Sequence, residues 1–242
     1  MLELKNISFS VESNGETREI LHDLDLTVRD QKFLVITGPN GSGKSTLAKL
    51  IAGIEKPSHG QILFNGEDIT DLDITQRARL GIGFAFQQPV RFKGITVLTL
   101  LRLAAGRRLS VSGACTYLAE VGLCARDYIN REVDASLSGG ELKRIEIATV
   151  LARGSRLTVF DEPEAGIDLW SFQNLIRIFE SMRENIRGSS MIIISHQERI
   201  LNIADEIALL TDGSIERHGG RDEIFPLLVG TEAAQEACDR LK

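Results

Sequence analysis

The spacing of hydrophobic residues changes along this chain, and the change predicts an α/β fold. Within residues 1–33, apolar side chains occupy alternate positions in two stretches, at Ile7, Phe9 and Val11 and again at Leu24, Leu26 and Val28. A period of two is typical of strands with one buried face, so we expect a largely antiparallel β-subdomain from residues 1–33 and 60–80. Continuous apolar runs follow at 33–36, 157–160, 191–194 and 207–210. Such runs predict strands of a mostly parallel sheet with both faces buried.

Helical spacing begins after the first of these runs. Leu47, Leu50, Ile51 and Ile54 recur at helical intervals, with Gly53 at the expected end. Between about residues 90 and 136, helix formers replace strand-like runs, which predicts a small helical insert. We therefore expect one domain over residues 1–242, carrying an N-terminal antiparallel β-subdomain and a helical subdomain.

A glycine-rich loop joins the strand at 33–36 to the helix that follows. Its residues are Gly38, Pro39, Asn40, Gly41, Ser42, Gly43, Lys44, Ser45 and Thr46. The Gly-x4-Gly-Lys-Ser pattern between a strand and a helix predicts a P-loop, whose backbone N–H groups cradle phosphates. Lys44 is expected to reach the β- and γ-phosphates of ATP, and the Ser45 hydroxyl to ligate Mg²⁺. The fold class is therefore an α/β P-loop NTPase core.

Polar residues at the ends of three other strands supply candidate catalytic groups. Asp161 and Glu162 end a buried strand, and consecutive strand residues point to opposite faces. We expect Asp161 to bind Mg²⁺ and Glu162 to act as general base on the attacking water. His196 follows the 191–194 strand and is either a structural residue or a contact of the γ-phosphate. The other candidate residues at this sheet edge favour the γ-phosphate contact. Gln87 is the candidate residue to coordinate Mg²⁺ or the attacking water, and Gln88 is a competing assignment for that role.

A second glycine cradle, Leu137-Ser138-Gly139-Gly140-Glu141, precedes an apolar-rich helix. Ser138 and Glu141 have the spacing of a capping box, which satisfies backbone donors at the helix start. Gly139 and Gly140 also expose N–H groups at that helix end, where an anion binds favourably. Because the P-loop already provides one phosphate site, the second cradle implies a second nucleotide, or one nucleotide shared across a dimer.

Together these motifs resemble the nucleotide-binding domain of ATP-binding cassette (ABC) ATPases over nearly the whole chain. Residues 38–46 resemble Walker A, Gln87 resembles the glutamine of the Q-loop, and residues 137–141 resemble the signature. Asp161 and Glu162 resemble Walker B with its catalytic glutamate. Residues 165–168 resemble the D-loop, and His196 resembles the switch histidine. The resemblance implies hydrolysis of ATP to ADP and phosphate with Mg²⁺. It also implies a transient ATP-dependent homodimer in which ATP lies between one subunit's P-loop and the other's signature, with Asp168 among the nucleotide-site residues.

Departures from the common transporter pattern suggest a subtype. Glu141 replaces the usual Gln. Glu164 and Gly166 make the stretch Asp-Glu-Pro-Glu-Ala-Gly-Ile-Asp, where transporters usually carry Thr or Ser and then Ser-Ala-Leu-Asp. These residues are similar to the SufC type, soluble ATPases of the SUF iron–sulfur assembly system, which implies SufB/SufD-type scaffold partners docked near the Q-loop and helical insert. The alternative is an importer ATPase coupled to a membrane permease. The family's adenine-stacking aromatic aligns with Val11, with Phe9 nearby.

Composition and charge bear on the classes of partner and on the location that we expect for the protein. The net charge is −6 and basic residues are dispersed, so we expect no nucleic-acid partner. Long heptad coils, typical of chromosome-maintenance ATPases, are absent from the interval between the two cradles. No apolar run approaches the roughly 20 residues of a membrane span, and the N-terminus lacks a secretory pattern, so we expect a cytoplasmic location without membrane insertion. Cys115, Cys124 and Cys238 lack metal-ligand spacing and are interpreted as buried thiols.

Overall fold

A six-stranded sheet forms the centre of the molecule, in the order β12-β11-β3-β10-β9-β6. The computed structural model describes residues 1–13, 15–184 and 188–239, with side chains described for 1–12, 15–184 and 188–230. The sheet strands are β3 (Phe33–Thr37), β6 (Ile82–Ala85), β9 (Leu157–Asp161), β10 (Ser190–Ile194), β11 (Glu206–Thr211) and β12 (Ser214–Gly220). Neighbouring strands are parallel except for β12, which pairs antiparallel with β11. Their carboxyl ends therefore meet at one edge, where ligands of α/β proteins bind.

Alternate residues of the central strands pack into two separate cores. Phe33 and Val35 of β3 belong to the core that includes residues of the helical insert, α6 and α7. Leu34 and Ile36 belong to the other core, shared with α1 and the N-terminal sheet. Because both faces are covered, these strands are apolar at consecutive positions, as the sequence predicted.

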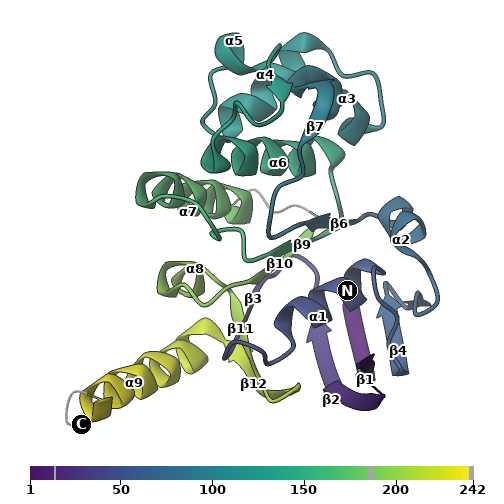
Figure 1. Cartoon of the computed structure of the whole chain (residues 1–242), viewed down its shortest axis with the longest axis vertical. Coiled ribbons are helices and arrows are strands. Elements are labelled where there is room, and N and C mark those ends of the chain that lie inside the picture. Colours follow the sequence, from purple (N-terminus) through teal and green to yellow (C-terminus); the bar gives the residue numbers. More distant parts are fainter. Residues whose placement is uncertain (14, 185–187, 240–242) are drawn as a thin grey trace.

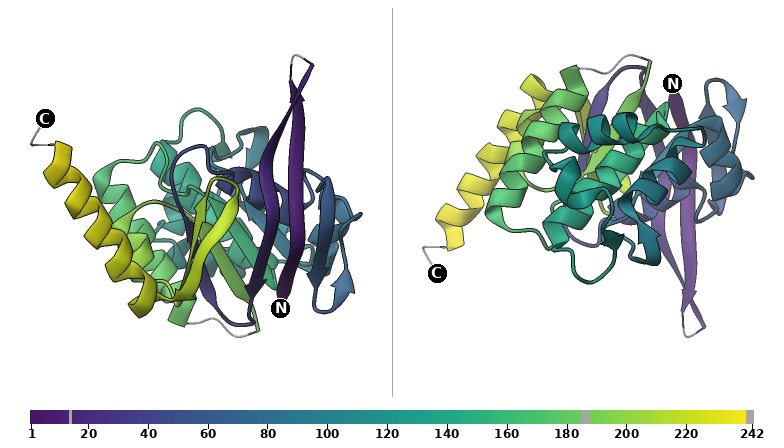
Figure 2. Two further views of the ribbon diagram at one scale, coloured as in Figure 1. Left: turned by 90° about the horizontal axis from the view of Figure 1, so that it is seen from below. Right: turned by 90° about the horizontal axis from the view of Figure 1, so that it is seen from above.

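The N-terminal sheet is antiparallel and lies beside the central one (Figures 1 and 2). It has the order β2-β1-β4-β5, formed by β1 (Leu2–Ser13), β2 (Glu16–Val28), β4 (His59–Phe64) and β5 (Glu67–Asp68). The expected fold class is thus confirmed, including its antiparallel β-subdomain.

One segment within residues 60–80 differs from its expected strand structure. Residues Ile74–Leu80 form helix α2, because Asp73 and Gln76 make a capping box at its start. Arg77 of α2 is fully buried and donates to the carbonyl oxygens of Leu50 and Ile51, at 2.6 and 3.0 Å. Helix α2 thus places the Arg77 guanidinium against the last carbonyl groups of α1 (Lys44–Ala52), which have no hydrogen-bond partner within that helix.

The helical insert lies at the top of Figure 1, on one side of the central sheet. It contains β7 (Phe92–Thr96), α3 (Val97–Ala105), α4 (Val111–Glu120), α5 (Ala125–Tyr128) and β8 (Glu132–Val133). Helix α6 (Gly139–Arg153) contacts both α3 and α4 and also β6, so it connects the insert to the sheet. A change in the position of the insert is therefore transmitted to the start of α6.

Three further helices follow in the part of the chain that the structure describes. They are α7 (Leu169–Glu184), α8 (Glu198–Asn202) and α9 (Arg221–Asp239), and α9 runs outward to the C-terminus (Figure 2). Among the helices of the described residues, none has the length and apolarity to cross a bilayer.

Candidate active site

The P-loop connects the carboxyl end of β3 to α1 and has a conformation that only glycine adopts without strain. Gly38, Gly41 and Gly43 have φ values of 145°, 81° and 100°. A Cβ on Gly38 would lie 1.9 Å from the carbonyl oxygen of Leu210, and one on Gly43 would lie 2.6 Å from a methyl of Leu21. Side chains at these positions would displace the backbone that forms the cradle.

Two side chains inside the loop are suited to phosphate. Lys44 is 5% exposed, and its Nζ donates to the carbonyl oxygens of Gly38 (2.8 Å) and Pro39 (2.7 Å). Burial lowers the pKa of Lys44, while Glu162 and Asp161 oppose this shift. The Ser42 hydroxyl is buried and has no hydrogen-bond partner among the described residues. A phosphate oxygen would satisfy that hydroxyl and would give the Lys44 ammonium a negatively charged acceptor.

Ser45 and Asp161 meet at the sheet edge, with the Ser45 hydroxyl donating to Asp161 Oδ1 over 3.0 Å. Burial raises the pKa of Asp161, and the Ser45 hydrogen bond works against that rise. A hydroxyl and a carboxylate are oxygen ligands of the type that Mg²⁺ prefers, so these residues fit the expected metal.

Glu162 is the first residue beyond β9 and turns away from the strand direction. Its φ is 42°, in the left-handed region, and its N–H donates to the carbonyl oxygen of Ile194 over 3.0 Å. The Gln87 side-chain amide donates to Glu162 Oε2 over 2.6 Å. Gln87, rather than its competitor Gln88, is thus in contact with the candidate base. The strained backbone at Glu162 is of the kind that recurs at functional sites.

A pocket of about 350 Å³ lies over the P-loop. It is lined by Arg18, Ile20, Asn40, Gly41, Gly43, Lys44, Ser45, Thr46 and Glu162. The sequence pattern places Arg18 and Ile20 in the N-terminal β-subdomain and contains no signal that they line this pocket. Arg18 pairs across the β1–β2 ladder with Val11, the position expected to face adenine. Phe9 packs against the core and does not line the pocket.

His196 lies beyond β10 at the same sheet edge as Asp161 but is not among the pocket-lining residues. Ser195 before it is fully buried and donates from its hydroxyl to Glu164, while accepting from the N–H of Gln197 at 3.0 Å. Glu164 Oε2 is buried without a hydrogen-bond partner among the described residues. Burial raises the pKa of Glu164, and the hydrogen bond from Ser195 partly opposes that rise. These contacts fix the backbone that carries His196.

The second cradle is the capped start of α6. The Ser138 hydroxyl accepts from the Glu141 N–H (3.3 Å), and Glu141 Oε2 accepts from the Ser138 N–H (2.7 Å). Glu141 Oε1 also accepts from the Tyr128 hydroxyl and lies 3.8 Å from Arg131. Burial disfavours the charged form, but these hydrogen bonds outweigh it and lower the pKa of Glu141 to about 2. Gly139 and Gly140 are the first residues of α6, so their N–H groups lie at the helix end where an anion binds favourably.

Asp168 caps α7 directly beside this cradle. The Ser171 hydroxyl donates to Asp168 Oδ2 (2.7 Å), and the N–H groups of Ser171 (3.0 Å) and Trp170 (2.9 Å) donate to Oδ1. These hydrogen bonds lower the pKa of Asp168. A Cβ on Gly140 would lie 2.4 Å from Ser171 Oγ, so the starts of α6 and α7 are in close contact. None of residues 137–141 lines the P-loop pocket. The two cradles of one chain therefore open onto different spaces.

A buried ion pair connects α6 to the Q-loop, a contact with no signal in the sequence pattern. Lys143, 1% exposed, donates from Nζ to Glu146 Oε2 (2.8 Å) and to the carbonyl oxygen of Phe86 (2.7 Å). Glu146 Oε1 accepts from the Phe86 N–H over 3.1 Å. Both backbone groups of Phe86, next to Gln87, are therefore held by the signature helix.

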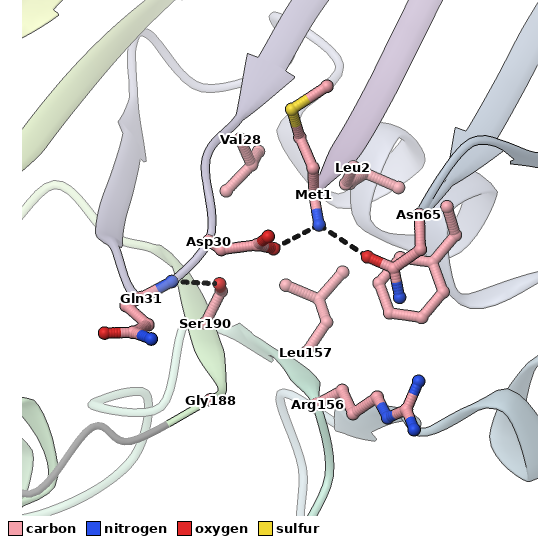
Figure 3. A pocket seen from close by; sticks show the side chains of 11 residues that line it. Met1, Leu2, Val28, Asp30, Gln31, Asn65, Arg156, Leu157, Gly188 and Ser190 are labelled. Carbon is pink, nitrogen blue, oxygen red and sulfur yellow. Dashed lines mark hydrogen bonds and ion pairs between the residues drawn. The ribbon is translucent and has the colours of Figure 1, made fainter.

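The opposite edge of the sheet has its own pocket of about 210 Å³ (Figure 3). There the Met1 amine donates to Asp30 and, over 2.7 Å, to Asn65 Oδ1, and the Gln31 N–H donates to Ser190 Oγ over 3.0 Å. No P-loop residue lines it, so it is separate from the candidate active site.

The cysteines depart from their expected burial. Cys124 is exposed and Cys115 partly buried, both as free thiols, and the side chain of Cys238 lies outside the described residues. Cys124 is exposed because it stands at the N-cap of the four-residue helix α5. Among the described residues, no group of three or more His, Cys, Asp or Glu side chains is placed to hold a metal ion.

Comparison with known proteins identifies the family. A profile of the ABC transporter family matches residues 21–165. This chain belongs to that family. It is 40% identical over 215 residues to an uncharacterized ABC transporter ATP-binding protein of Methanocaldococcus jannaschii, covering 86% of this chain and 85% of that one. It is 32% identical to a probable ATP-dependent transporter of Antithamnion sp., covering 94% of each chain. It is also 32% identical to the sulfate/thiosulfate import ATP-binding protein CysA of Synechocystis sp., covering 85% of this chain and 58% of CysA.

Solved ABC cassettes share the fold. A dimeric ATP-binding cassette in a post-hydrolysis state, bound to ADP and Pi, superposes with a TM-score of 0.81 at 25% identity, covering 91% of this chain and 99% of that one. A dimeric bacterial ABC transporter cassette gives 0.81 at 27% identity over the same shares. The chain is therefore an ABC ATPase, which binds and hydrolyses ATP.

Proposed function

We propose that this ABC ATPase hydrolyses ATP at the interface of a transient, ATP-dependent homodimer. The observation that carries the proposal is the separation of the two cradles: the P-loop pocket contains Lys44 and Glu162 but no residue of the signature. A second copy, turned head to tail, supplies the missing cradle to each pocket. The dimeric state of two solved cassettes supports this arrangement.

Residues of the pocket have distinct roles in this proposal. Residues 38–46 hold the phosphates, with Lys44 exchanging the Gly38 and Pro39 carbonyls for phosphate oxygens. Ser45, Gln87 and Asp161 would hold Mg²⁺, which supplies charge neutralisation for the transferred phosphoryl group. Ser138, Gly139, Gly140 and Glu141 of the partner subunit, with Asp168, complete the nucleotide site.

Glu162 acts as general base and His196 contacts the γ-phosphate. A carboxylate that follows the Walker B strand and accepts a hydrogen bond from Gln87 is held in a fixed orientation. Gln87 thus positions both the base and the water from which the base removes a proton. The Ser195–Glu164 hydrogen bond holds the residue before His196, and His196 Nε2 lies 3.3 Å from Gln197 Nε2.

Replacing Glu162 by Gln tests the mechanism. Because the amide cannot accept the proton of water but leaves the P-loop intact, Glu162→Gln is expected to bind ATP, accumulate as a dimer and lose turnover. Calorimetry, sedimentation and phosphate release measure the three properties. Normal phosphate release by Glu162→Gln would refute the assignment of the base.

We further propose that ATP hydrolysis drives a membrane permease docked beside the Q-loop. The names of relatives support a transporter role, since CysA is a sulfate/thiosulfate import protein. An apolar pocket of about 320 Å³ lies between the Q-loop and the helical insert, lined in part by Phe86, Val90 and Leu103, which are 41%, 47% and 64% exposed. An exposed apolar site next to the catalytic Gln87 is suited to a partner that senses the nucleotide.

A second candidate is the SUF assembly ATPase, acting with SufB/SufD-type scaffolds. The Glu141 contacts favour it, because Tyr128 and Arg131 of the insert recognise a carboxylate at the position where transporters usually have Gln. Both candidates use the same ATP chemistry and differ in the partner.

Affinity purification from native cells with and without detergent distinguishes the candidates. Co-purification of an integral membrane protein supports the permease, and co-purification of SufB/SufD-type proteins without detergent supports the scaffold. Leu103→Asp should lose either partner because a charge enters the apolar pocket, whereas Val111→Asp, at an exposed residue that does not line this pocket, should retain it. Retention by Leu103→Asp would contradict the docking site.

A further inference from the structure

Trp170, the only tryptophan of the chain, stands exposed beside the second cradle. Its exposed fraction is 77%, and no large apolar side chain among the described residues is more exposed. Leu169 next to it is 62% exposed. Two adjacent apolar side chains left in water are unfavourable for an isolated chain and are typical of interaction surfaces, where tryptophan is enriched as an anchor.

The backbone that presents Trp170 is fixed before any partner binds. Asp168 Oδ1 accepts from the N–H of Trp170, and its Oδ2 accepts from the Ser171 hydroxyl at 2.7 Å. The following α7 is anchored in the core by Leu175 and Phe179. Binding through Trp170 therefore requires little ordering of the backbone, which favours affinity.

Trp170 also lies on the route to the second cradle. Ser171 would touch a Cβ on Gly140, and the Gly166 carbonyl oxygen would lie 3.3 Å from a Cβ on Gly139. A molecule that brings a phosphate to Ser138 must therefore approach the start of α7 as well. The chain's own P-loop pocket does not include Ser138, so that phosphate arrives on another copy.

We propose that Leu169 and Trp170 are buried against a second copy of this chain when the ATP-dependent dimer closes, with Trp170 as a main anchor. The inference rests on the homodimer proposed above and assigns an interface residue to it. A membrane permease or soluble scaffold covering Trp170 is the competing occupant, and the test separates it from a second copy. The adjacency of Trp170 to the cradle that another copy must fill favours the second copy.

Fluorescence of the single tryptophan reports its burial directly. In the Glu162→Gln protein, adding ATP and Mg²⁺ is expected to shift Trp170 emission to shorter wavelength. Acrylamide quenching should fall by about threefold, because interface cores are packed like protein interiors. Sedimentation of the same samples shows whether the dimer has formed.

A substitution measures the energetic role. In the Glu162→Gln background, Trp170→Ala should raise the dimer dissociation constant by about thirtyfold, the size of an interface hot spot. Val111→Ala, at an apolar residue 50% exposed on α4, is the matched control and should leave that constant unchanged. Because both side chains are exposed, neither change removes a core residue.

Burial of Trp170 and formation of the dimer are measured separately. A dimer with unchanged Trp170 emission and quenching overturns the anchor while the homodimer stands. Quenching that falls only when a co-purified partner is added also overturns it, in favour of that partner. Absence of an ATP-dependent dimer overturns both the anchor and the homodimer.

Discussion

Arg18 is positioned to contact the base of an ATP whose phosphates lie in the P-loop. It lies on β2, lines the pocket over the P-loop, and faces Val11 across the ladder. A guanidinium is planar and stacks on aromatic rings, so an arginine here is able to cover adenine. We therefore expect Arg18, from the neighbouring strand, to provide the contact with adenine that the aliphatic Val11 does not.

Replacing Arg18 by Ala should weaken base binding and leave the chemistry intact. We expect KM for ATP to rise by about five- to tenfold with kcat unchanged, a size set by the loss of one cation–π contact. Inhibition by pyrophosphate, which has no base, should not change. Arg126→Ala, at an exposed arginine on α5, serves as control, and an equal loss of pyrophosphate inhibition in Arg18→Ala would contradict a base-specific role.

Glu141 should make stability depend on pH in acid. Its pKa is lowered from 4.5 to about 2, so its stabilisation is present above pH 4.5 and is lost as pH falls toward 2. Glu141→Gln keeps the cap but loses the charge, and should cost about 1–2 kcal/mol of unfolding free energy at neutral pH.

Urea unfolding of both proteins between neutral pH and the lowest pH at which they fold measures this difference. We expect the gap between wild type and Glu141→Gln to shrink below pH 4.5. A gap that is constant across this range would show that the carboxylate charge is not what stabilises the start of α6.

At the scale of elements, α6 connects three parts of the site. Its start carries the second cradle, its side contacts α3 and α4 of the insert, and its Lys143–Glu146 pair holds both backbone groups of Phe86. Since Gln87 follows Phe86 and contacts Glu162, a shift of α6 displaces the hydrogen-bond partner of the base. In the proposed mechanism, the helix couples the apolar pocket beside the Q-loop to Glu162.

Breaking this buried pair should destabilise the protein more than replacing it. Lys143→Met leaves Glu146 buried without its cation and should cost about 3–5 kcal/mol of unfolding free energy. Adding Glu146→Leu should recover most of that loss, because neither charge is then buried. Denaturant unfolding measures Lys143→Met, Glu146→Leu and the double variant, and a loss in the double variant equal to the sum of the two single losses would contradict the coupling.

Across the whole molecule, the features that the sequence predicts correctly are those that depend on residues close together in the chain. The P-loop, the strand-end carboxylates and the capping box at Ser138 are each specified within a few neighbouring residues, and the fold class followed from apolar runs. Helix α2 was missed because its Asp73–Gln76 cap precedes only seven helical residues. The pattern does not reveal that Arg18 lines the P-loop pocket or that Lys143 reaches Phe86, because the residues that they meet there are distant in sequence.

The central claim is that each ATP lies between the P-loop of one copy and the signature of another. Lys44→Ala disables the first cradle, and Ser138→Asp disables the second, because Asp still caps α6 but places a carboxylate against phosphate. Ser110→Asp, which alters the N-cap of α4 in the same way, is the control and should retain activity.

Phosphate release from a mixture of Lys44→Ala and Ser138→Asp proteins tests this claim most directly. Each variant alone has no intact site, but a mixed dimer has one, formed by the P-loop of the Ser138→Asp chain and the signature of the Lys44→Ala chain. An equal mixture should recover roughly a quarter of wild-type activity, since half of randomly formed dimers are mixed and each has one of two sites intact. Activity no greater than that of the two variants measured separately would contradict the shared site.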